Sequence, residues 1–134
     1  MSIAEDDTST SLLKVPPHSL EAECSVLGGL MLDEMAWDKI SSALTADDFY
    51  RGDHRVVFRV MEDLVEKNQP LDIITIAEAL DSVNELENVG GIAYISELAN
   101  NTPTASNIFA YAQIVAERAT VRKLISVAHE IADS

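Results

Sequence analysis

Between Pro103 and Ser134 the sequence contains neither glycine nor proline, the two residues that most readily end a helix. We therefore expect one helix over residues 105–133. At 1.5 Å per residue, such a helix is about 44 Å long. A body of about 100 residues has an expected radius of gyration of about 13 Å, so this helix must either project from the body or break.

The apolar side chains of this helix form two stripes, which change direction near Thr120. At 100° per residue, the stripes are rotated by about 140° from one another. The first contains Ile108, Ala112, Val115 and Ala119, and the second contains Val121, Ile125, Ala128 and Ala132. The first can pack on the body, whereas the second has the spacing of a helix that pairs with another helix. A kink near Thr120 that buries both stripes internally is the alternative, and periodicity does not decide between the two.

The first helix of the body is expected between Ser19 and Leu32. Ser19 can cap its N-terminus. A pair of glycines, Gly28 and Gly29, lies inside this pattern and weakens the helix, so we expect a close packing contact there. The apolar residues that the spacing assigns to one inward stripe are Leu20, Cys24, Leu27 and Met31.

Further segments show the apolar spacing of helices. They lie at residues 36–44, 53–67, 75–80 and 94–100. Asp53 can cap the second of them, and Thr75 with Glu78 forms a potential capping box for the third. The only run rich in β-branched residues, 72–76, overlaps that capping box and is therefore assigned to a helix start. We predict an all-α fold, in which a small multi-helix globular domain is followed by the long C-terminal helix.

The formal net charge is −14, with 23 acidic residues against 9 basic ones, which argues against an extended phosphate-binding surface. No apolar run approaches the roughly 18 residues of a membrane span. The first residues are polar and acidic, without the features of a signal peptide. We therefore expect a soluble, cytoplasmic chain with no membrane partner and a disordered acidic leader.

The sequence carries no motif of a known active site. There is no Gly-Lys pair for a phosphate-binding loop and no spacing for a di-iron or zinc site. The densest cluster of possible ligands is Asp47, Asp48, Asp53 and His54, where nearby arginines favour ion pairs instead. Cys24, on the inward stripe, is expected to be inert. We assign no catalytic, cofactor-binding or metal-binding residue and interpret the chain as an acidic, helical interaction module.

A set of segments resembles one family. They are VPPHSLEAE at 15–23, SVLGGLMLD at 25–33, DFYR at 48–51 with HR at 54–55, DIITIAE at 72–78, VGGIAYISELA at 89–99, NTPTA at 101–105 and, after Asn107, AYAQIVAERA at 110–119. In this order and spacing they are similar to the N-terminal domain of bacterial replicative DNA helicases, the DnaB family. Cys24 departs from the family, which usually carries glutamine there; this change should affect a local contact and not the fold.

The resemblance implies a division into a leader at 1–17, a helical N-terminal helicase domain at 18–119 and the start of a helical hairpin at 120–134, truncated before a linker and motor domain. It implies a non-catalytic domain that pairs subunits in a hexameric collar and docks primase during DNA replication. The parent protein is then an ATP-dependent DNA-unwinding motor, and ATP and Mg²⁺ belong to the missing motor domain. The implied partners are other helicase subunits, primase and a helicase loader, with DNA bound only through the full-length ring.

The second stripe falls where the resemblance places the first hairpin helix. We expect the subunit-pairing interface to contain Arg118, Val121, Arg122, Ile125, Ala128 and Ala132, with the two arginines at its rim. The sequence assigns no residue to primase contacts. Two other functions stay open: a direct single-stranded DNA-binding domain, which the negative charge disfavours, and a stand-alone helical adaptor.

Overall fold

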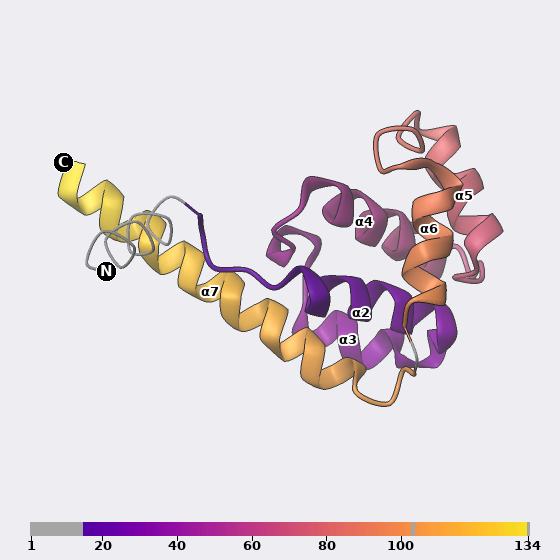
Figure 1. The fold of residues 1–134 in the computed structure, drawn as a ribbon, viewed down its shortest axis with the longest axis horizontal. Helices are drawn as coiled ribbons and strands as arrows, with labels where there is room; N and C mark the ends of the chain where they lie inside the picture. Colours follow the sequence, from indigo (N-terminus) through magenta and orange to yellow (C-terminus); the bar gives the residue numbers. More distant parts are fainter. Residues whose placement is uncertain (1–14, 103, 134) are drawn as a thin grey trace, which may run out of the picture.

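A computed structural model describes residues 15–102 and 104–133. The predicted leader therefore lies mostly outside the described residues. Within them, every regular element is helical, as the sequence predicts (Figure 1). The α-helices are α2 (Leu20–Leu32), α3 (Trp37–Ala43), α4 (Gly52–Glu66), α5 (Ile73–Ser82), α6 (Gly91–Asn100) and α7 (Ile108–Asp133), and the short 3-10 helices are η1 (Glu34–Ala36) and η2 (Ala46–Asp48).

Helix α2 lies at the centre of the body and packs against α4, α6 and α7. Helix α5 packs against α4 and α6 at the end of the body far from the tip of α7 (Figure 1). An aromatic cluster fills the core between α3 and α4, where the Phe58 ring lies 5.0 Å from Trp37 and 5.1 Å from Phe49, measured between ring centroids. The body is thus held by side chains from elements that are distant in sequence.

The N-terminus of α2 is capped as the sequence predicts, but its buried face differs. The backbone N–H of Ala22 donates to Ser19 Oγ at 3.2 Å. Of the predicted stripe, only Leu27 is buried; Leu20 is exposed, and Cys24 and Met31 are half-buried. The helix is covered on several sides, so a single stripe could not describe it. Its buried residues are Ala22, Glu23, Val26, Leu27, Gly28, Gly29 and Leu30.

The glycine pair of α2 forms the close packing contact that we predicted. A Cβ atom on Gly28 would lie 2.1 Å from Thr102 Oγ1 and 2.2 Å from the carbonyl oxygen of Leu98, so α6 approaches α2 at backbone distance. A Cβ atom on Gly29 would lie 2.8 Å from Ile108 Cδ1, at the first residue of α7. These glycines therefore allow two helices to pack closely on α2.

Two predicted N-caps lie two and three residues after the observed ones. Helix α4 begins at Gly52, so Asp53 lies inside its first turn and is not the cap. Helix α5 begins at Ile73, and its cap is Asp72, whose Oδ1 accepts from the backbone N–H of Thr75 at 2.7 Å. An aspartate side chain one residue before the helix supplies the acceptor, and the proposed Thr75–Glu78 box is not used.

Helix α7 runs without a break through Thr120, so of the two alternatives that the periodicity left open, the kink is wrong. All four residues of the first stripe are buried: Ile108, Ala112, Val115 and Ala119. The second half of the helix projects from the body (Figure 1). No helix in the described ranges is long and apolar enough to cross a membrane.

Candidate interface and the polar clusters beside it

The second stripe of α7 is exposed, at the position that the sequence assigns to an interface. Val121 is 41% exposed and Ile125 is 39% exposed, and Ala128 and Ala132 are also exposed. Sequence reasoning missed Leu124 and Val127, which are 64% and 50% exposed; Leu124 lies beside the stripe, and Val127 follows Leu124 one turn later on the same helix. Leu124 follows Val121 at helical spacing, so the signal was present. Together these side chains form an apolar surface on the projecting half of α7.

The two arginines predicted at the interface rim lie closer to the body. Arg118 and Arg122 are both half-buried. Arg122 donates from Nη1 to the carbonyl oxygen of Pro17 at 2.8 Å and from Nη2 to that of Asp48 at 2.7 Å. Its guanidinium carbon also lies 5.5 Å from the centroid of the Tyr50 ring. Arg122 thus binds its own chain at the base of the projecting half.

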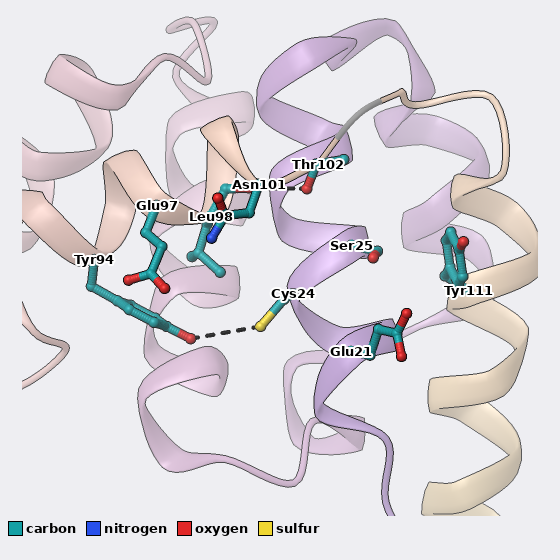
Figure 2. A pocket seen from close by; sticks show the side chains of 9 residues that line it. All are labelled: Glu21, Cys24, Ser25, Tyr94, Glu97, Leu98, Asn101, Thr102 and Tyr111. Atoms are coloured by element: carbon teal, nitrogen blue, oxygen red, sulfur yellow. Dashed lines mark hydrogen bonds between the residues drawn. The ribbon is translucent and has the colours of Figure 1, made fainter.

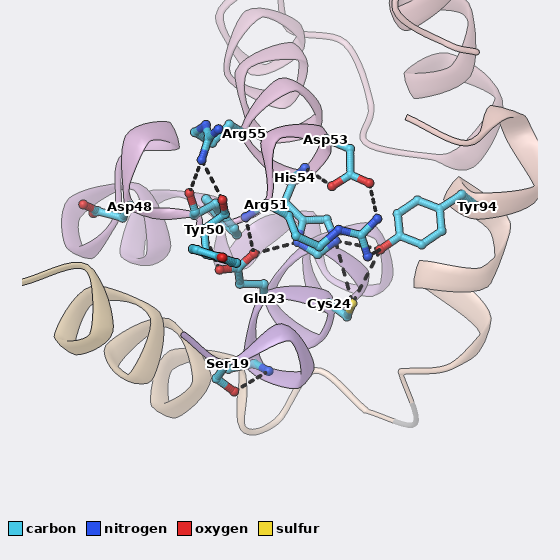
Figure 3. A network of polar contacts seen from close by, with 12 residues as sticks. Ser19, Glu23, Cys24, Asp48, Tyr50, Arg51, Asp53, His54, Arg55 and Tyr94 are labelled. Carbon is cyan, nitrogen blue, oxygen red and sulfur yellow. Dashed lines mark hydrogen bonds and ion pairs between the residues drawn. The ribbon is translucent and has the colours of Figure 1, made fainter. Parts of the chain in front are cut away.

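A buried ion pair connects α2 with α4 (Figure 3). The side chains of Glu23 and His54 are 1% and 0% exposed, and Glu23 Oε1 lies 2.7 Å from His54 Nδ1. The second carboxylate oxygen, Oε2, accepts from the backbone N–H of Tyr50 at 2.7 Å. This pairing satisfies the charge that burial would otherwise leave without a partner.

The pair shifts both of its pKa values toward the charged forms. Burial by itself would raise the pKa of Glu23, but hydrogen bonds from His54 and from the Tyr50 backbone outweigh it and lower this pKa. Burial would lower the pKa of His54, but its contacts with Cys24 and Glu23 outweigh it and raise this pKa. The cluster therefore favours an imidazolium held between acceptors.

The other nitrogen of His54 faces α6 and the only cysteine of the sequence (Figure 3). His54 Nε2 lies 2.6 Å from Tyr94 Oη and 3.8 Å from Cys24 Sγ, and the Cys24 and Tyr94 atoms are 3.7 Å apart. Arg51 donates to Tyr94 Oη at 3.3 Å and pairs with Asp53. Burial raises the pKa of Tyr94, so this phenol stays protonated at neutral pH.

Cys24 lies at the edge of a pocket of about 290 Å³, and this corrects its assignment as an inert buried thiol (Figure 2). Its contact with His54 lowers the pKa of the thiol. The pocket is bounded by α2, α6 and α7, and its lining residues are Glu21, Cys24, Ser25, Tyr94, Glu97, Leu98, Asn101, Thr102 and Tyr111. A thiol in such surroundings has more thiolate character than an ordinary cysteine.

The acidic cluster near residue 50 is used largely for ion pairs, as the sequence predicts. Arg51 pairs with Asp53, and Arg59 Nη2 lies 2.5 Å from Asp47 Oδ1. Arg55 departs from the prediction, because it donates to backbone carbonyl oxygens. Within residues 15–102 and 104–133, no group of three His, Cys, Asp or Glu side chains is placed to hold a metal ion.

Sequence reasoning missed the roles of Glu23 and His54, although both lie on apolar helix faces. Glu23 is four residues before Leu27 and seven before Leu30, and His54 is four before Phe58 and seven before Met61. This spacing places each charged residue on the inward face of its helix. The contact between them could not be read from it, because they are 31 residues apart.

Comparison with known proteins gives one consistent result. A family model described as the DnaB-like helicase N-terminal domain matches residues 15–117. The replicative DNA helicase DnaB of Haemophilus influenzae is 49% identical over 132 residues, which are 98% of this chain and 28% of that protein. That of Pasteurella multocida is 53% identical over 120 residues, or 90% of this chain and 26% of that protein. The chain thus spans about a quarter of these relatives.

Two solved structures of DnaB-type helicases are also similar to this chain. A crystal structure of the N-terminal domain of DnaB helicase from Mycobacterium tuberculosis has a TM-score of 0.86 and 38% identity, over 89% of this chain and 83% of that one. A structure of a DnaB-like replicative helicase and its interactions with primase has a TM-score of 0.74 and 30% identity, over 84% of this chain and 26% of that one.

Proposed function

Because the chain belongs to the family of DnaB-like helicase N-terminal domains, we propose that it assembles helicase subunits and docks primase during DNA replication. It corresponds to a non-catalytic domain of a replicative helicase. ATP hydrolysis, Mg²⁺ binding and DNA unwinding are assigned to a motor domain outside this chain. DNA is then contacted only through the full-length ring, in the cytoplasm.

The observation that carries the assembly role is the exposed stripe of α7. A continuous helix buries its first stripe on the body and leaves Val121, Ile125, Ala128 and Ala132 exposed, with Leu124 beside them. Apolar side chains at helical spacing on a projecting helix are suited to pairing with a second helix. We infer that the partner is the corresponding helix of a neighbouring subunit, in a hexameric collar.

The primase role is supported by a structural neighbour and not by a site in this chain. The DnaB-like replicative helicase with a TM-score of 0.74 was solved together with its interactions with primase. By analogy, we propose primase as a partner of this chain and a helicase loader as a further partner. We assign no residue to either contact.

The assembly role is tested with Ile125→Asp in the full-length helicase. Ile125 is exposed, so the substitution leaves the body folded, but it places a charge in the proposed interface and weakens hexamer assembly. Sedimentation velocity should show smaller species than for the unmodified protein. The matched control is Ser126→Asp, which adds the same charge at the next exposed position.

The two variants give a clear decision. Assembly that is reduced by Ile125→Asp and retained by Ser126→Asp supports pairing through the stripe. An unchanged sedimentation profile for Ile125→Asp would remove this stripe from the interface.

A further inference from the structure

Helix α7 changes from a buried to an exposed helix within one turn, and Arg122 lies at the change. Ala119 is buried against the body, whereas Val121 is exposed. After Arg122, every described side chain through Asp133 is exposed. Arg122 is therefore the last described residue of α7 that is half-buried against the body.

Arg122 makes contacts that fix a direction as well as a position. Its two terminal nitrogens donate to carbonyl oxygens of Pro17 and Asp48, which are 105 and 74 residues away in the sequence. A guanidinium is planar, and its donors diverge at fixed angles, so two acceptors on different segments restrict its rotation. Both acceptors are uncharged carbonyl groups, and the side chain is partly shielded from water.

The surface beneath Arg122 is itself anchored in the core. The Tyr50 ring, which Arg122 covers, is stacked on His18 with 4.0 Å between ring centroids and 10° between ring planes. The backbone N–H of Tyr50 donates to the buried carboxylate of Glu23. Helix α7, the segment before α2 and the loop after η2 are therefore joined at one place.

We propose that Arg122 is a positioning residue that sets the direction in which the projecting half of α7 leaves the body. We call Arg122, Pro17, Asp48, Tyr50 and His18 the Arg122 cluster. The direction is set within one chain, whether or not the exposed stripe binds a second copy. This inference therefore goes beyond the assembly role and can be tested separately from it.

The competing explanation is that the buried stripe of α7 alone sets the direction, since Ala112, Val115 and Ala119 already hold the helix on the body. In that case Arg122 would contribute only to stability. Distances between the body and the tip of α7 distinguish these explanations, because a purely stabilising residue leaves them unchanged in the folded protein.

The experiment measures the distance between one spin label on α5 and one near the end of α7. Glu78 and Glu130 are exposed and suit labelling through cysteine substitutions, with Cys24→Ser removing the native thiol. Labelled chains are diluted into an excess of unlabelled chains, so that only distances within one chain contribute. Pulsed electron–electron double resonance gives the distance distribution for each variant.

We expect a single narrow distribution in the labelled parent, and a shifted or broadened one for Arg122→Ala. Arg122→Lys should act in the same direction, because an ammonium cannot reproduce the divergent donors of the guanidinium. The matched control is Arg118→Ala, which removes the same charge one turn earlier on α7 and should keep the parent distribution. Circular dichroism checks that each variant is folded.

An Arg122→Ala distribution that superimposes on the parent in folded protein would overturn the proposal. If Arg122→Ala does not fold, Arg122→Lys is judged by the same criterion. A change of equal size in Arg118→Ala would also overturn it, because the effect would then follow from lost charge on the helix. These outcomes do not depend on hexamer assembly, so failure here and failure of the assembly role are separate results.

Discussion

The Cys24 thiol lies between the imidazole ring of His54 and the phenol of Tyr94. His54 Nε2 and Tyr94 Oη lie 3.8 and 3.7 Å from its sulfur. The contact with His54 lowers the thiol pKa more than burial raises it. The fraction of thiolate at neutral pH is therefore larger than for an ordinary cysteine.

This pKa shift predicts the pH dependence of alkylation. The rate of reaction with iodoacetamide, followed by mass spectrometry, should reach half its maximum below the ordinary cysteine pKa of about 8.5. His54→Gln should move this midpoint to higher pH, because the imidazolium that stabilises the thiolate is lost. The same cysteine in urea-unfolded chain is the internal reference. A folded-state midpoint at or above that of the unfolded chain would contradict the shift.

Glu23 illustrates why single residues are hard to interpret from sequence. At the start of α2 its carboxylate is expected to interact with the helix dipole, yet the structure turns it inward to His54 and the Tyr50 backbone. Both partners come from segments that are about thirty residues away. Periodicity identifies the inward face of each helix, but it does not identify which faces meet.

At the scale of helices, the contact between α2 and α6 depends on Gly28. A Cβ atom there would overlap Thr102 Oγ1 and the Leu98 carbonyl oxygen, and the latter belongs to backbone that cannot move alone. Thr102 Oγ1 also donates to that carbonyl oxygen at 2.9 Å, so a hydrogen bond at the end of α6 holds both groups in place against Gly28. The lack of space for a Cβ atom, and not helix propensity, explains why glycine occupies this position.

We therefore expect Gly28→Ala to lower the free energy of unfolding by about 2 kcal/mol, which is typical of overpacking. Alanine is the better helix former by about 1 kcal/mol, so the sign of the result separates packing from propensity. Urea unfolding measures the change. Gly52→Ala is the control, because a Cβ atom there would meet only the guanidinium of Arg55, at 3.3 Å. Unfolding at equal or greater urea concentration for Gly28→Ala would contradict the contact.

The sequence predicted which segments form helices, because those signals lie within a few residues of one another. It did not predict which surfaces the helices pack against. The absence of glycine and proline after residue 103 predicted α7, but the two stripes left open whether the second half of this helix is buried, and the structure shows that it is exposed. Ser19 was predictable as a cap because its acceptor lies within one turn of its donor. The acceptors of Arg122 come from two segments that are distant in the sequence, so its orientation toward the body could not be predicted without the fold.

For the whole molecule, the distribution of charge separates the body from the projecting helix. Residues 105–134 contain three acidic side chains, Glu117, Glu130 and Asp133, and three basic ones, Arg118, Arg122 and Lys123. The net charge of −14 therefore lies entirely within residues 1–104. A neutral helix can pair with its copy while the acidic bodies keep apart.

The docking role predicts binding of primase by this chain. Calorimetric titration with the C-terminal domain of a primase should give saturable binding, since the family resemblance assigns docking to this part of the helicase. Another domain of the same primase is the control and should give only heats of dilution. A flat titration with the C-terminal domain would contradict docking by this chain and move the contact to other parts of the helicase.

The Arg122 cluster also has a mechanical consequence. Beyond Arg122, α7 extends for about 16 Å, so it acts as a lever whose pivot lies at the body surface. A rotation of about 10° at this pivot displaces the tip by about 3 Å. A displacement of this size is enough to disrupt the packing of one helix in the grooves of another. A ligand that displaces only the segment at Pro17 would therefore move the tip of α7, and with it any chain paired with the exposed stripe.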